Sequence, residues 1–381
     1  MSMALSSVAG VQERVVRPAE HRNEILCVQS LRGIAVLIVL VVHVEDMANR
    51  MPYFHNVHTW YSERFGYSAP DLFFVISGFI MSYITLGMPF RPKQWAISRF
   101  IRIYPMYFLF TFLALLIFLA RPDQPVMGSG PHDAWTIVQS FLMLPQKHLP
   151  LLFVGWTVQH EVVFYLIVFI VASTMRTALL VPVLTLLSLC ALARWALVHR
   201  LGVADWSWNV PSLFLWQFLM GALVYRYREE ARRLGILGAA AGATICLIGG
   251  VVFADSGSMG AEEPVRVLLF GAAYAFTLVA FLNHENLAKS RGTYDPTDRP
   301  FIVRLGDASY SMYLVHPFIL AIFGHVGRWL DLTGAVAYLW LPVAYGAVIV
   351  CGMVLYPNVE KPLLNHCRRL LLKRPAREVA R

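Results

Sequence analysis

The chain has 381 residues, of which 57% are hydrophobic and 14% are charged. Soluble domains carry about 25% charged residues, so this composition excludes an ordinary soluble protein and indicates an integral membrane protein. The formal net charge of +9 does not indicate a nucleic-acid partner, because the basic residues gather at the ends of apolar segments. At about 20 residues per transmembrane helix, the chain has room for roughly ten spans and little else.

Ten apolar segments predict ten helices, so we expect an all-α membrane bundle. The segments cover residues 27–47, 70–86, 101–120, 159–174, 177–198, 211–227, 235–254, 265–283, 306–324 and 335–356. Residues 27–362 would form the membrane domain, between a polar tail of residues 1–26 and a basic tail of residues 363–381 that lies on anionic lipid. The first span is expected to be an uncleaved signal anchor.

The distribution of Lys and Arg predicts the orientation of the bundle. With the N-terminus in the cytoplasm, 24 of the 32 Lys and Arg residues lie at the cytoplasmic side. Cytoplasmic loops carry an excess of basic residues, so we expect both termini there. The outer connection 121–158 contains an apolar stretch, Trp135–Leu144, which is too short to span and is expected to be re-entrant or interfacial.

Between Leu31 and Val44 of the first span, Arg32 and His43 are the two polar residues in an otherwise apolar run. Eleven residues at about 100° each make three turns plus about 20°, so both side chains share one helix face, roughly 16 Å apart along the axis. Asp46 neighbours His43 on that face and could orient it as a general base. Ionisable residues within a span generally mark function. The alternative is a structural His, with Arg32 reaching the lipid headgroups.

The second and third spans begin with further candidates. Asp71 caps the outer end of the second span, where it either binds substrate or supports packing. Arg99 and Arg102 lie three residues apart at the cytoplasmic end of the third span, on one helix face. Paired arginines match the geometry of phosphate, and the alternative is that they only anchor the helix at the membrane surface.

The fourth and ninth segments hold the remaining candidates. Glu161 is expected at the depth of His43, where it would orient the imidazole or contact the acceptor, or merely stabilise the helix N-terminus. Trp156 and Tyr165 flank it as candidate acceptor-binding residues. His316, ahead of a proline expected to kink the helix, is either a further acceptor contact or structural. The spacing of Cys and His gives no metal-ligand pattern, so we expect no metal.

Six segments, in this order, resemble the acyltransferase 3 family of bacterial membrane acyltransferases. They are Leu31–Ala35 with the spacing from Arg32 to His43, Asp71–Phe79, Arg99–Pro105, Gly155–Tyr165, Leu305–His316 and Glu360–Pro362. The resemblance runs from about residue 27 to residue 362 and looks closest to the branch that acts in exopolysaccharide production. Gln159 and His160 differ from the pair expected before Glu161.

The resemblance implies a ten-helix protein of the bacterial inner (cytoplasmic) membrane. It implies that acyl-CoA, expected to be acetyl-CoA, is the co-substrate and that Arg32, Arg99 and Arg102 bind it. The acceptor would be a hydroxyl of a carbohydrate or glycolipid, and polysaccharide-assembly proteins are the expected partners. It also implies that His43 is the essential catalytic residue. We hypothesise that His43 acts as general base or as a transient acyl carrier.

Two other classes of protein fit intramembrane His and Arg residues. In a transporter or flippase, these residues would form a proton relay or a substrate path, although no inverted repeat is evident. A non-catalytic partner in a polysaccharide assembly complex is the third class. Consumption of acetyl-CoA would distinguish the enzyme from both.

Overall fold

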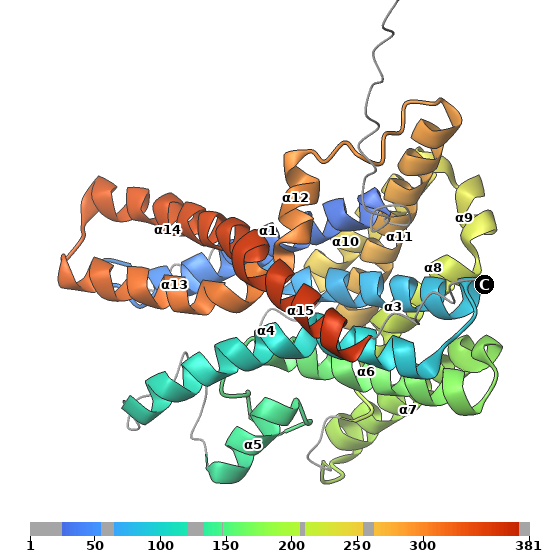
Figure 1. Cartoon of the computed structure of the whole chain (residues 1–381), viewed down its shortest axis with the longest axis horizontal. Coiled ribbons are helices and arrows are strands. Elements are labelled where there is room, and N and C mark those ends of the chain that lie inside the picture. Colours follow the sequence, from blue (N-terminus) through green and yellow to red (C-terminus); the bar gives the residue numbers. More distant parts are fainter. Residues whose placement is uncertain are drawn as a thin grey trace, which may run out of the picture.

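The computed structural model describes residues 25–54, 65–120, 133–146, 148–205, 210–253 and 263–372, and this part of the chain is helical without strands (Figure 1). The long helices are α1 (Leu26–Ala48), α3 (Ala69–Gly87), α4 (Pro92–Ala120), α6 (Gly155–Thr174), α7 (Leu180–Leu201), α10 (Gly235–Phe253), α11 (Pro264–Ser290), α13 (Ser309–Trp329) and α14 (Gly334–Leu355). The shorter ones are η2 (Gly66–Ser68), α5 (Ala134–Leu142), η4 (Thr177–Leu179), α8 (Leu215–Arg226), α9 (Arg228–Arg233), α12 (Phe301–Asp307), η5 (Tyr356–Glu360) and α15 (Lys361–Leu371). The predicted fold class is therefore confirmed as all-helical.

Nine helices in the described ranges are long and apolar enough to cross a membrane, whereas the sequence predicts ten spans. The difference lies at residues 211–227. There the structure has α8, a helix of 12 residues, which is about 18 Å long and shorter than the roughly 30 Å hydrocarbon core. The protein is thus a multi-pass membrane protein, and the expected count of ten is not confirmed.

Helix α8 lies in the interior of the bundle against α3. A Cβ atom on Gly78 of α3 would collide with the backbone of Phe218, and one on Gly221 of α8 would collide with the backbone of Val75. Small residues let helix backbones approach closely in a membrane, where hydrophobic burial gives little drive for association. The two glycines therefore allow α8 to lie directly against α3.

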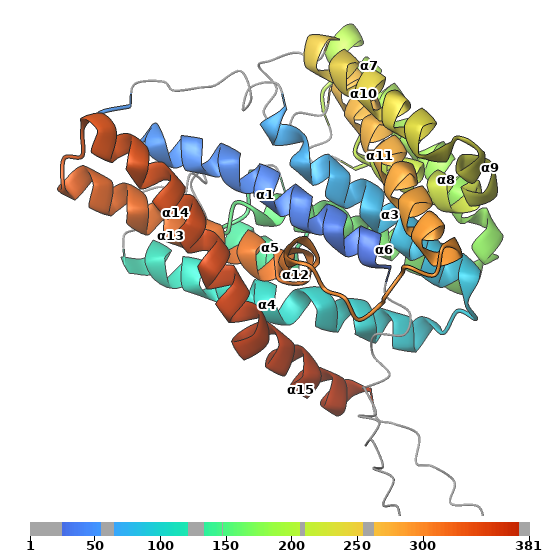
Figure 2. The same ribbon diagram turned by 90° about the horizontal axis from the view of Figure 1, so that it is seen from above.

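Helix α1 runs through the middle of the molecule, with α3 on one side and α13 and α14 on the other (Figure 2). In its N-terminal half, Gly33 lies against the backbone of α12, and Gly306 of α12 lies against the backbone of Gln29. Because α1 contacts so many helices, its polar side chains reach interior space between them instead of lipid.

The predicted outer segment 135–144 forms a helix and a turn. The backbone N–H of Thr136 donates to Asp133, and this hydrogen bond lowers the pKa of the Asp133 carboxyl. Helix α5 has 9 residues and ends at Leu142, and Met143 follows it in the left-handed conformation. It is too short to span a bilayer, as expected, and its position in the membrane stays a prediction. Helix α15 continues past residue 362, where the sequence predicts that the membrane domain ends and the basic tail begins.

Candidate active site

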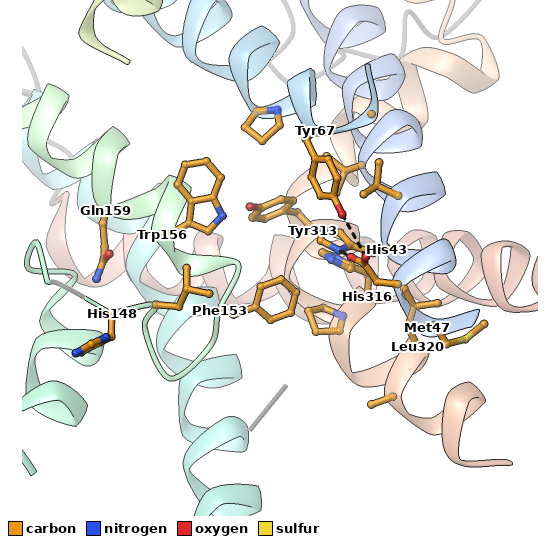
Figure 3. A pocket seen from close by; sticks show the side chains of 18 of the residues that line it. His43, Met47, Tyr67, His148, Phe153, Trp156, Gln159, Tyr313, His316 and Leu320 are labelled. Carbon is orange, nitrogen blue, oxygen red and sulfur yellow. Dashed lines mark hydrogen bonds and ion pairs between the residues drawn. The ribbon is translucent and has the colours of Figure 1, made fainter. Parts of the chain in front are cut away.

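A cavity of about 860 Å³ lies on the side of the bundle where α1 ends and α6 begins. Its walls come from α1, the turn before α3, the loop before α6, and helices α6, α7 and α13. Figure 3 shows His43, Tyr67, Phe153 and His316 gathered at one end of it, with Trp156 across the opening. The rim includes the exposed residue Arg50, so the cavity opens to the outside of the bundle.

His43 is held by a carboxylate from its own helix. Its Nδ1 lies 3.0 Å from Oδ2 of Asp46, and the hydroxyl of Tyr67 donates to Oδ1 of the same residue at 3.2 Å. Because a carboxylate only accepts hydrogen bonds, Nδ1 carries the proton and the lone pair of the neutral ring is on Nε2. This is the arrangement in which a histidine can remove a proton from a hydroxyl.

His316 stacks on His43 from α13. Their ring centroids lie 4.8 Å apart at 22°, and Phe153 meets the edge of the His43 ring at 5.4 Å. His316 is fully buried, and neither of its ring nitrogens has a hydrogen-bond partner among the described residues. The structure therefore brings together the two intramembrane histidines that the sequence separates by 273 positions.

A second cavity of about 220 Å³ lies toward the N-terminal half of α1 and is lined by Arg32, Arg99 and Arg102. Glu161 lines it too, accepting hydrogen bonds from Ser77 at 2.9 Å and from Tyr165 at 2.6 Å. Three guanidinium groups against one lining carboxylate leave an excess of positive charge. Such a site suits an anion with several oxygens, since guanidinium groups pair with phosphate and carboxylate in two-pronged geometry.

Arg102 is anchored by a residue that sequence reasoning gave no role. Its Nη1 lies 3.1 Å from Oε1 of Glu360, which is fully buried, and Ser311 donates to the other carboxylate oxygen at 2.6 Å. Glu360 is the last residue of the five-residue π-helical turn Tyr356–Glu360. Its occurrence in the Glu–Lys–Pro segment that resembles the family was the only sequence signal for it.

Two predicted positions need correction. Glu161 was expected at the depth of His43, but it lines the arginine cavity, and Asp46 alone of the two proposed carboxylates contacts the imidazole. Glu161 lines the arginine cavity because it lies on a face of α6 that is turned toward α3, where it accepts a hydrogen bond from Ser77. Tyr165, a candidate acceptor contact, lies one turn further along that face and also lines the arginine cavity.

Asp71 lines neither of the two cavities. It is fully buried, and its carboxylate lies 3.0 Å from Nη2 of Arg266 in α11. The same nitrogen donates to the backbone carbonyl of Tyr67 at 2.8 Å. This ion pair therefore fixes the turn that carries Tyr67, which in turn contacts Asp46. Tyr67 went unnoticed in the sequence because it belongs to a loop rather than to a predicted span.

Of the remaining predictions, Trp156 lines the larger cavity. Within the described ranges, no three His, Cys, Asp or Glu side chains come together as a metal site would require. The class of protein is thus defined: a multi-pass helical membrane protein with a His–Asp pair in one interior cavity and clustered arginines in another. In the part of the chain that the structure describes, only Pro70 and Tyr313 line both cavities.

The chain belongs to the acyltransferase 3 family, because residues 25–356 match it as an acyltransferase domain. The enzyme transfers acyl groups other than aminoacyl groups, and both predictions are confirmed. It is 28% identical over 309 residues to the exopolysaccharide production protein ExoZ of Rhizobium meliloti, covering 80% of this chain and 91% of that protein. It is 24% identical over 383 residues to the acyltransferase MdmB of Streptomyces mycarofaciens, covering 90% and 92%. No solved structure matches the chain.

Proposed function

We propose that this enzyme takes an acyl group from cytoplasmic acyl-CoA and transfers it to a hydroxyl of a carbohydrate at the outer face of the bacterial inner membrane. The observation that carries the proposal is the pair of adjoining cavities, one lined by three arginines and the other by His43 with Asp46. The first suits a phosphorylated donor and the second suits activation of a hydroxyl. The similarity to a protein named for exopolysaccharide production supports a carbohydrate acceptor.

The donor site would use the three arginines to hold the phosphates of coenzyme A. Arg32 comes from α1, whereas Arg99 and Arg102 come from α4, so the three can surround a ligand from two sides. Glu360 would hold Arg102 in position through their ion pair. An acetyl group is small and fits a cavity of about 220 Å³ through which the pantetheine arm must also pass.

The chemistry would centre on Nε2 of His43. In direct transfer, this nitrogen removes the proton of the acceptor hydroxyl, whose oxygen attacks the thioester carbon; the new C–O bond forms, the C–S bond breaks, and the proton ends on the thiol of coenzyme A. In the alternative, Nε2 itself attacks the thioester carbon, so that a C–N bond forms, the C–S bond breaks and coenzyme A leaves as its thiolate. The acceptor oxygen then attacks the acyl carbon, the C–N bond breaks, and the proton of the acceptor hydroxyl ends on the thiol. Asp46 would hold the ring in the required tautomer in both cases.

The proposal includes ten membrane crossings with both termini in the cytoplasm. Helix α8 would provide the tenth crossing, because it runs alongside α3 over most of its length. Phe214, just before α8, contacts Phe74 near the start of α3, whereas Tyr225 near the end of α8 contacts Phe79. The two helices therefore run in the same direction, as two spans that both enter from outside would.

The test uses inverted membrane vesicles, labelled acetyl-CoA and carbohydrate acceptors, with His43→Ala as the variant. Loss of a general base typically costs 10²–10⁴-fold in rate, so we expect a fall of at least about 100-fold in labelled acceptor. His284→Ala is the matched control, because His284 is exposed on α11 and lines neither cavity. Undiminished transfer by His43→Ala would refute the assignment, and a wild-type protein that never consumes acetyl-CoA would favour a transporter or an assembly partner.

A further inference from the structure

The two cavities adjoin each other at Tyr313, and this residue has no role in the steps above. Resting on the function just described, we propose that Tyr313 is a seal between the donor and acceptor half-sites, and that it determines whether the acyl group goes to the acceptor or to water. Of the described residues that line the cavities, only Tyr313 and Pro70 belong to both. A thioester that leaves the arginine cavity for His43 must therefore pass between these two side chains.

Tyr313 is held in position by two contacts of its hydroxyl with residues at the start of α6. Its hydroxyl donates to the carbonyl oxygen of Val154 at 2.9 Å and lies 2.8 Å from Oγ1 of Thr157. Its ring lies against His316 on the acceptor side, with centroids 5.7 Å apart, and against Phe73 on the donor side at 6.4 Å. Figure 3 shows the ring next to the two stacked histidines, with the hydroxyl directed away from them.

The seal has a chemical purpose because His43 does not distinguish a sugar hydroxyl from water. With the acceptor, acyl-CoA and a hydroxyl give an ester and the free thiol of coenzyme A. With water, which enters through the open rim of the outer cavity, acyl-CoA gives a carboxylate, a proton and the same thiol. Transfer is therefore efficient only if the thioester reaches His43 when the acceptor is already bound.

The hydrogen bonds of the Tyr313 hydroxyl are weak enough for a bound acceptor to break. Each contact of the Tyr313 hydroxyl joins neutral groups, and neutral hydrogen bonds contribute modestly to net stability. Pro70 is rigid about φ, so the movable side of the constriction is the tyrosine. Opening then requires a change of side-chain rotamer at Tyr313 and no displacement of a helix.

The first experiment compares the release of thiol with the formation of ester, using purified protein in liposomes. Tyr313→Phe keeps the ring but loses the fastening, and Tyr313→Ala also removes the ring. For Tyr313→Phe we expect thiol release without acceptor to rise roughly fivefold, as for the loss of one neutral hydrogen bond from a closed state, and to rise further for Tyr313→Ala. Equal amounts of thiol and ester in both variants, with no release in the absence of acceptor, would overturn the proposal.

Tyr107→Phe is the matched control for these variants. Tyr107 is also buried, and its hydroxyl donates to the backbone carbonyl of Ser140 at 3.0 Å, but it lines neither cavity. It therefore reports what the loss of such a hydrogen bond does to stability alone. Tyr107→Phe should keep the wild-type ratio of thiol to ester, and a matching increase in this control would also overturn the proposal.

The second experiment does not depend on catalysis. Ser77 lines the arginine cavity but not the outer one, so Ser77→Cys, with the five native cysteines replaced, reports access to the inner side of the seal. A membrane-impermeant maleimide added from outside should label it slowly with Tyr313 present and several-fold faster in Tyr313→Phe and Tyr313→Ala. Equal labelling would refute the seal while leaving the acyltransferase proposal intact, whereas absence of ester formation by the unaltered enzyme would refute the latter.

Discussion

At the residue scale, the catalytic role proposed for His43 would depend on a short series of contacts that starts outside the cavity. Arg266 pairs with Asp71 and donates to the backbone of Tyr67, whose hydroxyl contacts Asp46, which in turn holds His43. Each contact restricts the rotamers of the next side chain. Orientation of a catalytic group by neighbours of this kind raises the fraction of time it spends in productive geometry.

Replacing Tyr67 by Phe tests this series of contacts, because it removes the hydrogen bond to Asp46 and keeps the aromatic ring. The change removes one hydrogen bond to a carboxylate, which typically contributes about 1.5–3 kcal/mol, so we expect kcat to fall about tenfold or more. The KM for acetyl-CoA should not change, because Tyr67 does not line the arginine cavity. Tyr338→Phe, at an exposed tyrosine of α14, should leave both constants unaltered, and a wild-type kcat for Tyr67→Phe would contradict the assignment.

At the element scale, the backbone contact between α3 and α8 determines where several site residues lie. Helix α3 carries Ser77, which contacts Glu161, and it follows the turn that carries Tyr67. The neighbouring Gly78 faces α8 at a distance that leaves no space for a side chain. A larger residue at this position must move one helix relative to the other.

Gly78→Leu is therefore expected to destabilise the bundle. Overpacking of a close interface typically costs about 1–3 kcal/mol, which should appear as a lower temperature of heat-induced aggregation in detergent. Gly346→Leu is the control, because a Cβ atom there meets nothing within 4 Å. If the two variants aggregate at the same temperature, the close approach of α3 and α8 does not support the fold.

At the scale of the whole molecule, topology depends on the short helix α8. If it crosses the membrane, the chain makes ten crossings and both of its ends lie on the same side of the membrane. If it does not cross, every helix after it is inverted. The excess of basic residues in the expected cytoplasmic segments favours the crossing.

Fusion reporters after residues 90, 233 and 372 decide this question. We expect all three to report a cytoplasmic position, since each would follow an even number of crossings. A periplasmic signal after residue 233 with a cytoplasmic signal after residue 90 would show that α8 does not cross. A periplasmic signal after residue 90 would invert the bundle and remove the basis for a donor site at the arginines.

The sequence by itself determined the features that lie within one helix. The length and apolarity of the segments predicted a membrane bundle, and the helical repeat placed Asp46 beside His43, as the structure confirms. The order of the polar segments was enough for the family. The sequence alone did not determine the number of spans, because the apolar segment 211–227 is longer than the helix α8 that forms within it.

Only the tertiary structure decided which helix faces meet. It stacked His316 on His43, turned Glu161 toward the arginines, paired Asp71 with Arg266, and set Tyr313 between the two cavities. Periodicity gives the face of a helix on which a residue lies, but the partner of that face depends on close packing among distant segments. That packing rests on contacts such as those of Gly78 and Gly221, which no local pattern of residues specifies.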